Sequence, residues 1–131
     1  YSVKLADLWS SRGRRDYGLD DIMLLKVGRH IRPRPHFKLI VAREEGESRY
    51  LQGYRKEFAH FEVESHGGPV TLVDGEPTAD ELELSARIVA RYSQGRDAGE
   101  VTLAFTDRAG VARRMQVAPL PPHEVRSEWM L

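Results

Sequence analysis

The sequence predicts an α+β domain, in which an antiparallel sheet of about five to six strands carries one long helix and a short N-terminal helix. Three observations lead to this prediction. Several short stretches alternate apolar and polar residues, as half-buried strands do. One longer stretch, over 79–94, has helical periodicity and end signals. The chain of 131 residues, 40% of them hydrophobic, suffices for a single hydrophobic core.

The first elements expected along the chain are a short helix and a β-hairpin. Apolar residues within 3–11 allow a short helix, and an exposed basic loop follows it over 11–18. The stretches 22–31 and 37–43 are apolar enough to be strands. Because Pro33-Arg34-Pro35 separates them, a continuous helix is excluded and a hairpin with a basic tip is predicted.

The middle of the chain is predicted to add a short helix and a second strand pair. Residues 44–57 place Tyr50, Leu51 and Tyr54 at helical spacing. Residues 58–64 alternate, with Phe61 and Val63 on one face and polar side chains on the other. We expect this strand to pair with 70–73 across the turn over 65–69.

The long helix has the strongest local signals in the sequence. Thr78 and Glu81 form a T-x-x-E capping box after Pro77, and Gly95 marks the stop, which predicts a helix over 79–94. An apolar stripe runs along it, and this stripe must pack on a sheet or on other helices. The stripe contains Leu82, Ala86, Ile88, Val89 and Tyr92.

A second hairpin and a tail complete the predicted organisation. Residues 101–106 and 111–117 are expected to be strands joined by a turn at 107–110. From Pro119 the chain is rich in proline, and we expect the core to end there. The domain division is therefore an N-terminal arm with a short helix over 1–20, a folded domain over 21–118 and a tail over 119–131.

Composition excludes several classes of protein. The longest apolar runs, such as 39–42, fall far below the ~18 residues that a membrane span needs, so no membrane partner is expected. Zero cysteines exclude disulfides, thiolate metal ligands and a cysteine nucleophile, and they favour a cytoplasmic location. Because the chain begins at Tyr1 rather than methionine, we expect it to be part of a longer protein.

The net charge of zero conceals two oppositely charged segments. Residues 12–56 contain twelve Lys and Arg against six acidic residues, whereas 57–90 contain eight acidic residues and only Arg87. The stretch 22–43 has no acidic residue at all, which indicates an anion-binding surface. Alternatively, its cations pair with the acidic segment of the same domain or with another domain.

Catalytic and metal signals are weak. The histidine pairs His30/His36 and His60/His66 are not spaced for one helical turn. No G-x-S-x-G motif and no glycine-rich phosphate loop is present. His60 shares a strand face with Glu62 and Glu64, and these three side chains are a weak candidate for an acid–base pair or a metal site. We favour the interpretation that they form an ordinary exposed strand face. We therefore expect no catalytic residue, metal or cofactor.

Four sequence strings also carry a family resemblance. They are LLKVGRHIR (24–32), KLIVAR (38–43), GPV (68–70) and ARIVARYS (86–93), in this order. Together they resemble the RNA-binding domain of the NFACT family over roughly residues 1–117. More narrowly, the chain resembles the version at the C-terminus of bacterial PP-loop proteins similar to tRNA thiouridylases.

The sequence departs from the family pattern at several positions. After the second strand the pattern is close to G-R-N-x-x-E-N, and here Ala42, Glu44 and Ser48 replace the glycine and the two asparagines while Glu47 is kept. Two histidines of the ribosome-quality-control members also have other residues in register. A role in ribosome rescue is therefore not expected.

The resemblance implies an accessory domain that binds RNA, with tRNA as the expected partner, while a separate N-terminal PP-loop domain of the same chain does the chemistry. This chain has no S-G-G-x-D-S motif, so we expect it not to be an enzyme by itself. The alternative is a protein-docking or self-association domain, including a homo-oligomer. The candidate RNA-binding residues are Lys26, Arg29, His30, Arg32, Arg34, Lys38, Arg43, Arg91, Tyr92, Ser93 and Arg96.

Overall fold

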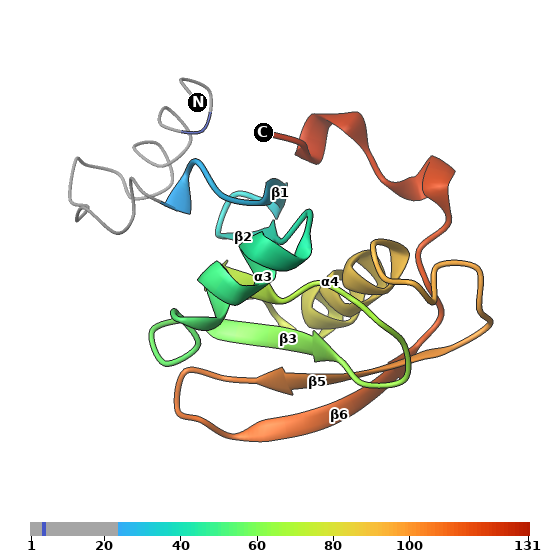
Figure 1. The fold of residues 1–131 in the computed structure, drawn as a ribbon. Coiled ribbons are helices and arrows are strands. Elements are labelled where there is room, and N and C mark those ends of the chain that lie inside the picture. Colours follow the sequence, from blue (N-terminus) through green and yellow to red (C-terminus); the bar gives the residue numbers. More distant parts are fainter. Residues whose placement is uncertain (1–3, 5–23) are drawn as a thin grey trace.

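The computed structural model describes Lys4 and residues 24–131, which form a twisted antiparallel sheet with helices on both faces (Figure 1). The six strands lie in the order β1-β2-β4-β3-β5-β6. Their bounds are β1 Arg29–Arg34, β2 Phe37–Val41, β3 Ala59–Val63, β4 Thr71–Gly75, β5 Val101–Thr106 and β6 Ala112–Val117. The helices are α3 Glu45–Gln52 and α4 Ala79–Arg91, followed by the 3-10 turns η1 Pro122–Glu124 and η2 Ser127–Trp129. The predicted α+β class and antiparallel sheet are confirmed.

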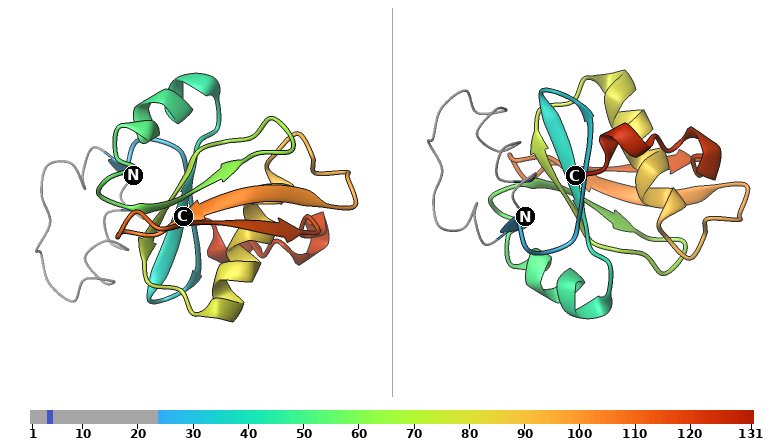
Figure 2. Two further views of the ribbon diagram at one scale, coloured as in Figure 1. Left: turned by 90° about the horizontal axis from the view of Figure 1, so that it is seen from below. Right: turned by 90° about the horizontal axis from the view of Figure 1, so that it is seen from above.

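Strand β2 has both faces buried because the two helices lie on opposite sides of the sheet (Figure 2). Phe37, Leu39 and Val41 belong to the larger core cluster, which also contains the apolar stripe of α4. Ile40 points the other way, into a smaller cluster with Leu51 of α3. The sheet is therefore covered on both faces at β2, which agrees with the nearly continuous apolar run of this strand.

The first predicted strand begins later than expected, because residues 24–28 form a turn and not the start of β1. Leu24 and Leu25 are buried in this turn, and Gly28 has a φ of 77°. A side chain at Gly28 would lie 3.0 Å from the carbonyl oxygen of Val41. The turn therefore packs tightly against the end of β2 before the edge strand starts.

Helix α4 is shorter than the predicted 79–94. Its start is as expected, since the Thr78 hydroxyl accepts from the Glu81 N–H and the Glu81 carboxylate accepts from the Thr78 N–H. Its end differs because the Ser93 hydroxyl donates to the Ala90 carbonyl and accepts from the Gly95 N–H. The serine side chain thus takes up the last helical bonding groups, and the helix ends at Arg91.

Helix α3 is also shorter than the predicted 44–57. It ends at Gln52, because Gly53 is its C-cap and residues 53–57 continue as tight turns. The pairing of the strands over 58–64 and 70–73 is confirmed, although β4 lies between β2 and β3. The hairpin of β5 and β6 is likewise confirmed.

The prediction that the core ends at Pro119 is wrong. Leu120 and Trp129 are buried members of the main core cluster. The backbone of Met130 bridges to Ile31, and the Leu131 N–H donates to the His30 carbonyl at 3.0 Å. The C-terminal segment therefore lies along α4 and adds to the edge beside β1 (Figure 2).

Apart from Lys4, the expected N-terminal helix and the basic loop within 1–20 lie outside the described residues. Among the residues that the structure describes, no helix is long and apolar enough to cross a membrane.

Candidate nucleic-acid interface

The predicted basic residues separate to the two ends of α4. Arg32 and Arg34 lie at the turn between β1 and β2, beside the N-terminal end of the helix. Arg29 begins β1 and Arg43 follows β2, so both lie near the C-terminal end. The 13 residues of α4 separate these two groups by about 20 Å. One continuous basic stretch of sequence thus forms two surfaces.

The turn between β1 and β2 is paired with the acidic segment of the chain. Glu81 lies 2.7 Å from Nε2 of His36 and 3.8 Å from Nε of Arg34. The N–H of Thr78, and after it the side chain of His36, lower the pKa of Glu81. Arg32 donates to the Pro35 carbonyl at 3.1 Å. Glu81 therefore partly neutralises the positive charge of this turn within the domain.

His30 and Lys38 are buried, with exposed fractions of 1% and 2%. Nε2 of His30 lies 3.0 Å from the Leu24 carbonyl and 3.1 Å from that of Val27, so this nitrogen carries the hydrogen. Burial, and next the charge of Lys38, lower the pKa of His30 to about 3. The neutral imidazole holds the turn before β1 and is not available to a ligand in this structure.

At the other end of α4, an arginine of the edge strand lies on an aromatic ring. The guanidinium carbon of Arg29 is 4.8 Å from the ring centroid of Tyr92. Tyr92 is half-buried and packs against the main core cluster. Beside it, Nη2 of Arg91 lies 3.8 Å from the highly exposed Asp97. The ring thus has a structural role and also supports an exposed cation.

Arg43 is held by a carboxylate that organises three segments. Oε1 of Glu47 accepts from the N–H and Nε of Arg43 at 2.9 and 3.1 Å, and Oε2 accepts from Nη2 at 2.8 Å. Oε2 also accepts from the Gly28 N–H at 3.0 Å. The Arg43 side chain, the first cause, lowers the pKa of Glu47 to about 2. The arrangement orients Arg43 while leaving about half of its side chain exposed.

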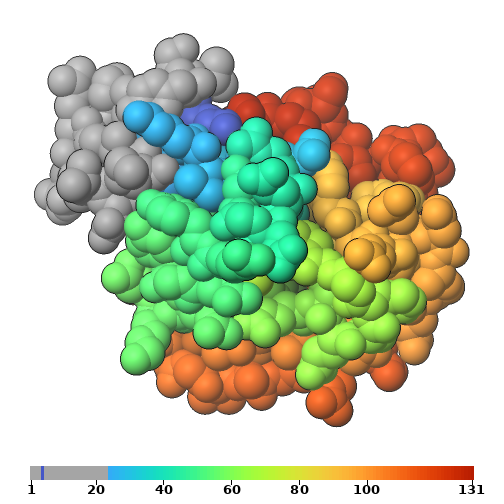
Figure 3. Space-filling view, viewed as in Figure 1, coloured from blue at the N-terminus to red at the C-terminus, as the bar shows by residue number. Residues whose placement is uncertain are grey.

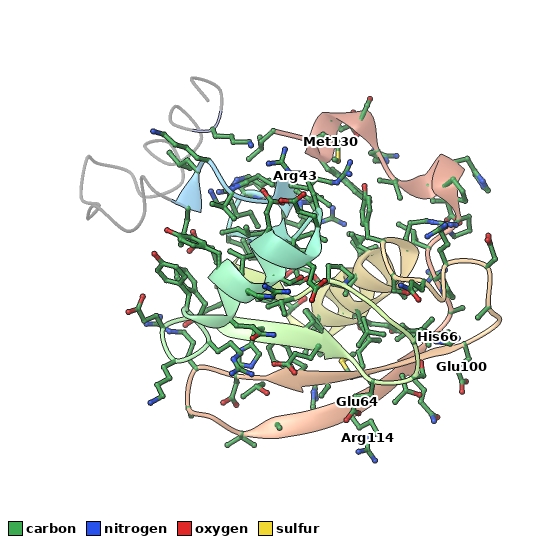
Figure 4. The ribbon with its side chains drawn as sticks, viewed as in Figure 1. Arg43, Glu64, His66, Glu100, Arg114 and Met130 are labelled. Atoms are coloured by element: carbon green, nitrogen blue, oxygen red, sulfur yellow. The ribbon has the colours of Figure 1, made fainter. Side chains whose placement is uncertain are left out.

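Two hollows flank Tyr92. The first has a volume of about 450 Å³ and lies between α3, the loop 67–70 and the C-terminal end of α4; these segments meet on the face shown in Figure 3. The second lies between α4 and the C-terminal segment. Tyr92 and Arg96 line both. Arg43 lines the first hollow, and Arg91, Arg126 and Met130 line the second; Figure 4 shows Arg43 and Met130 on the same side of the molecule.

We call this region the arginine surface. It comprises Arg29, Arg43, Arg91, Tyr92, Arg96 and Arg126. Sequence analysis proposed all of these except Arg126, which lies in the segment taken for a tail. Ser93 is also present but is 1% exposed, and its hydroxyl is satisfied within the protein. Lys26 is exposed in the turn before β1.

The weak acid–base candidate is not assembled. His60 is 7% exposed, and its Nδ1 lies 3.2 Å from the Phe58 carbonyl. Glu62 binds Arg55 at 3.0 Å, and Glu64 binds Arg114 at 2.7 Å, as Figure 4 shows for the latter pair. Within the described part of the chain, no group of three His, Cys, Asp or Glu residues is placed to hold a metal ion.

Comparison with known proteins gives one family and one fold. A family model described as the NFACT protein RNA binding domain matches residues 28–130. The C-terminal part of the fibronectin/fibrinogen-binding protein from Streptococcus suis is similar in structure, with a TM-score of 0.64 and 14% identity. That match covers 80% of this chain and 49% of the other, so the chain spans about half the length of that solved chain. No curated protein matches the sequence.

Proposed function

Since the chain belongs to the NFACT RNA-binding domain family, we propose that it binds tRNA and that the arginine surface makes the contact. The single observation that supports this location is that cations from several segments of the chain come together there. Cations from β1, the end of β2, the end of α4 and the C-terminal segment lie around two adjoining hollows. The end of α4 and the C-terminal segment are far in sequence from the basic stretch 22–43, so that stretch alone does not explain the gathering.

Arginine suits this role because its planar guanidinium binds phosphate in two places and stacks on bases. Several arginines of the surface already contact carboxylates, such as Arg126 with Glu128 at 2.8 Å. Both side chains of this pair are about two-thirds exposed. Exposed ion pairs are worth little, typically about 0–1 kcal/mol, so an RNA phosphate replaces such a partner at small cost. The surface is therefore suited to a polyanion despite its nearby acids.

The wider setting of the domain is part of the proposal. The resemblance of LLKVGRHIR and ARIVARYS to thiouridylase-like proteins supports an accessory domain that presents tRNA to an N-terminal PP-loop domain of the same chain. In this setting the domain carries no catalysis of its own and acts in the cytoplasm. The lack of cysteine is consistent with that compartment.

The proposal is tested by fluorescence anisotropy of the chain with unmodified tRNA over a series of salt concentrations. Engaging roughly four to six phosphates gives a log–log slope of about −3 to −5. Binding that is absent at about 50 mM salt would overturn the assignment of tRNA as the partner.

A protein-docking or self-association role is the second candidate, favoured by the mixed charge of the arginine surface. Glu44 and Glu45 line the first hollow together with Arg43 and Arg96. Such a surface fits a partner, or a second copy, that carries both signs of charge. Sedimentation without RNA at low and high salt distinguishes it, because charge-driven association appears without RNA and weakens as salt screens it.

A further inference from the structure

Resting on the proposed function, we propose that the first hollow receives the base of one unpaired nucleotide. The domain then prefers RNA with an unpaired segment over a continuous duplex. The hollow lies between α3, the loop 67–70 and the end of α4. Its volume of about 450 Å³ is within the roughly 300–1,000 Å³ of sites that bind small ligands.

Small, buried residues form the bottom of the hollow. Ala42 and Val70 are each 6% exposed, and Ser93 is 1% exposed. The Ala42 N–H donates to the Val70 carbonyl at 3.1 Å and joins the end of β2 to the loop. The floor is therefore closed by small, buried residues whose backbones are tied together, and a base that enters the hollow rests against it.

The rim has the opposite character. Gln52 of α3 and Gln94 after α4 are exposed and line the hollow from two sides. Each amide offers both donors and an acceptor, which match the edge of a nucleobase. Arg43 and Arg96 are also exposed at the hollow and are suited to the attached phosphates.

The loop wall is fixed closely against α4 by two glycines. A side chain at Gly68 would lie 2.6 Å from Val63 Cγ2, and one at Gly67 would lie 2.7 Å from Gln94 Cδ. The Gln94 N–H donates to the Gly67 carbonyl at 2.7 Å. The hollow therefore has a defined wall, whose position depends on residues without side chains.

This geometry favours an unpaired nucleotide over a duplex. In A-form RNA the paired bases are stacked inside, and a protein meets mainly phosphates and 2′-hydroxyls on a convex surface. A base enters a hollow only when it is unstacked, as in a loop, a bulge or a single-stranded end. Because Tyr92 and Arg96 line both hollows, a strand that passes from one to the other crosses the arginine surface.

The test is a comparison of three labelled RNAs by anisotropy: a single strand of about ten nucleotides, its blunt duplex and a duplex with one bulged nucleotide. The variants are Gln52→Trp, which fills the hollow, and Gln116→Trp, the same change on β6 outside the residues that line it. Thermal melting of each variant confirms that the fold is retained.

We expect the single strand and the bulged duplex to bind about tenfold more tightly than the blunt duplex. Gln52→Trp removes this preference, and Gln116→Trp keeps it. Equal affinity for all three RNAs, or no effect of Gln52→Trp, overturns the nucleotide site while leaving the proposed RNA binding intact. If the unmodified chain binds none of the three RNAs, both the nucleotide site and the proposed RNA binding are overturned.

Discussion

The guanidinium of Arg29 lies 4.8 Å over the ring of Tyr92 and thereby joins the edge strand β1 to the end of α4. The two residues are 63 positions apart in the sequence. Arg29 is exposed, whereas Tyr92 packs on the core, so the ring supports the cation from beneath. A guanidinium held in one orientation loses less freedom when it binds a phosphate or stacks on a base.

The first prediction concerns this stack. Tyr92→Leu keeps an apolar side chain on the core but removes the ring, so tRNA affinity should fall by about 1 kcal/mol, or several-fold. Tyr92→Phe keeps the ring and should keep the affinity. Anisotropy with the three proteins measures the effect, and an unchanged affinity for the leucine variant would show that the stack contributes nothing to binding.

A second prediction separates the two ends of α4. Arg34→Glu places like charges beside Glu81, from which Nε of Arg34 is now 3.8 Å away. The free energy of unfolding should fall only slightly, because the Arg34 side chain is about half exposed to water and its contact with Glu81 is long. Affinity for tRNA should change by less than about twofold, since this turn lies at the far end of the helix. A large loss of affinity without unfolding would move the interface to the hairpin turn.

A third prediction follows from the low pKa of Glu47. Its value of about 2 in the fold lies below the ordinary 4.5, so the folded state holds this carboxylate ionised where the unfolded state begins to protonate. The stabilisation is complete above pH 4.5 and is lost as the pH falls toward 2. Urea unfolding at pH 6 and pH 3 should show a smaller decrease for Glu47→Gln than for the unmodified chain. Equal decreases would contradict the role of Glu47.

A fourth prediction concerns His30, whose pKa falls from 6.5 to about 3 mainly because of burial. Below pH 6.5 the unfolded chain takes up a proton that the folded chain excludes, so the free energy of unfolding declines from pH 6.5 toward 3. In His30→Phe this part of the decline is absent. The variant should also lose about 1–3 kcal/mol at pH 7, because the carbonyls of Leu24 and Val27 lose their donor.

A parallel decline for the phenylalanine variant and the unmodified chain would contradict the buried neutral state of His30. The positive charges of Lys38 and Lys4 both oppose protonation of His30. Measurements at a fixed ionic strength keep their contribution constant between the two proteins.

Local signals predicted the parts of the fold that depend on local physics. The capping box of Thr78 and Glu81 places the start of α4 correctly. The alternation over 101–106, with the turn at 107–110, gives the hairpin of β5 and β6. In both cases hydrogen bonds between near neighbours, or a single buried face, decide the structure.

The remainder depends on contacts that no local pattern encodes. Apolar residues of the C-terminal segment follow no helical or strand period, so Leu120 and Trp129 gave no signal of a place in the core. Lys38 was taken for a surface cation, but β2 lies inside the sheet with α3 covering its second face. The site itself combines Arg29, Arg96 and Arg126 from three distant segments, and only the family resemblance indicated what such a gathering binds.

The arginine surface is tested most directly by charge reversal at Arg96 and Arg126, with reversal at Arg108 and Arg113 of the β5–β6 hairpin as the matched control. Anisotropy with unmodified tRNA at about 50 mM salt should show at least tenfold weaker binding for the first double variant and little change for the second. The salt dependence of the first should also be shallower by about two phosphate contacts. Equal losses for both double variants would show a diffuse electrostatic attraction and would contradict an interface at the end of α4.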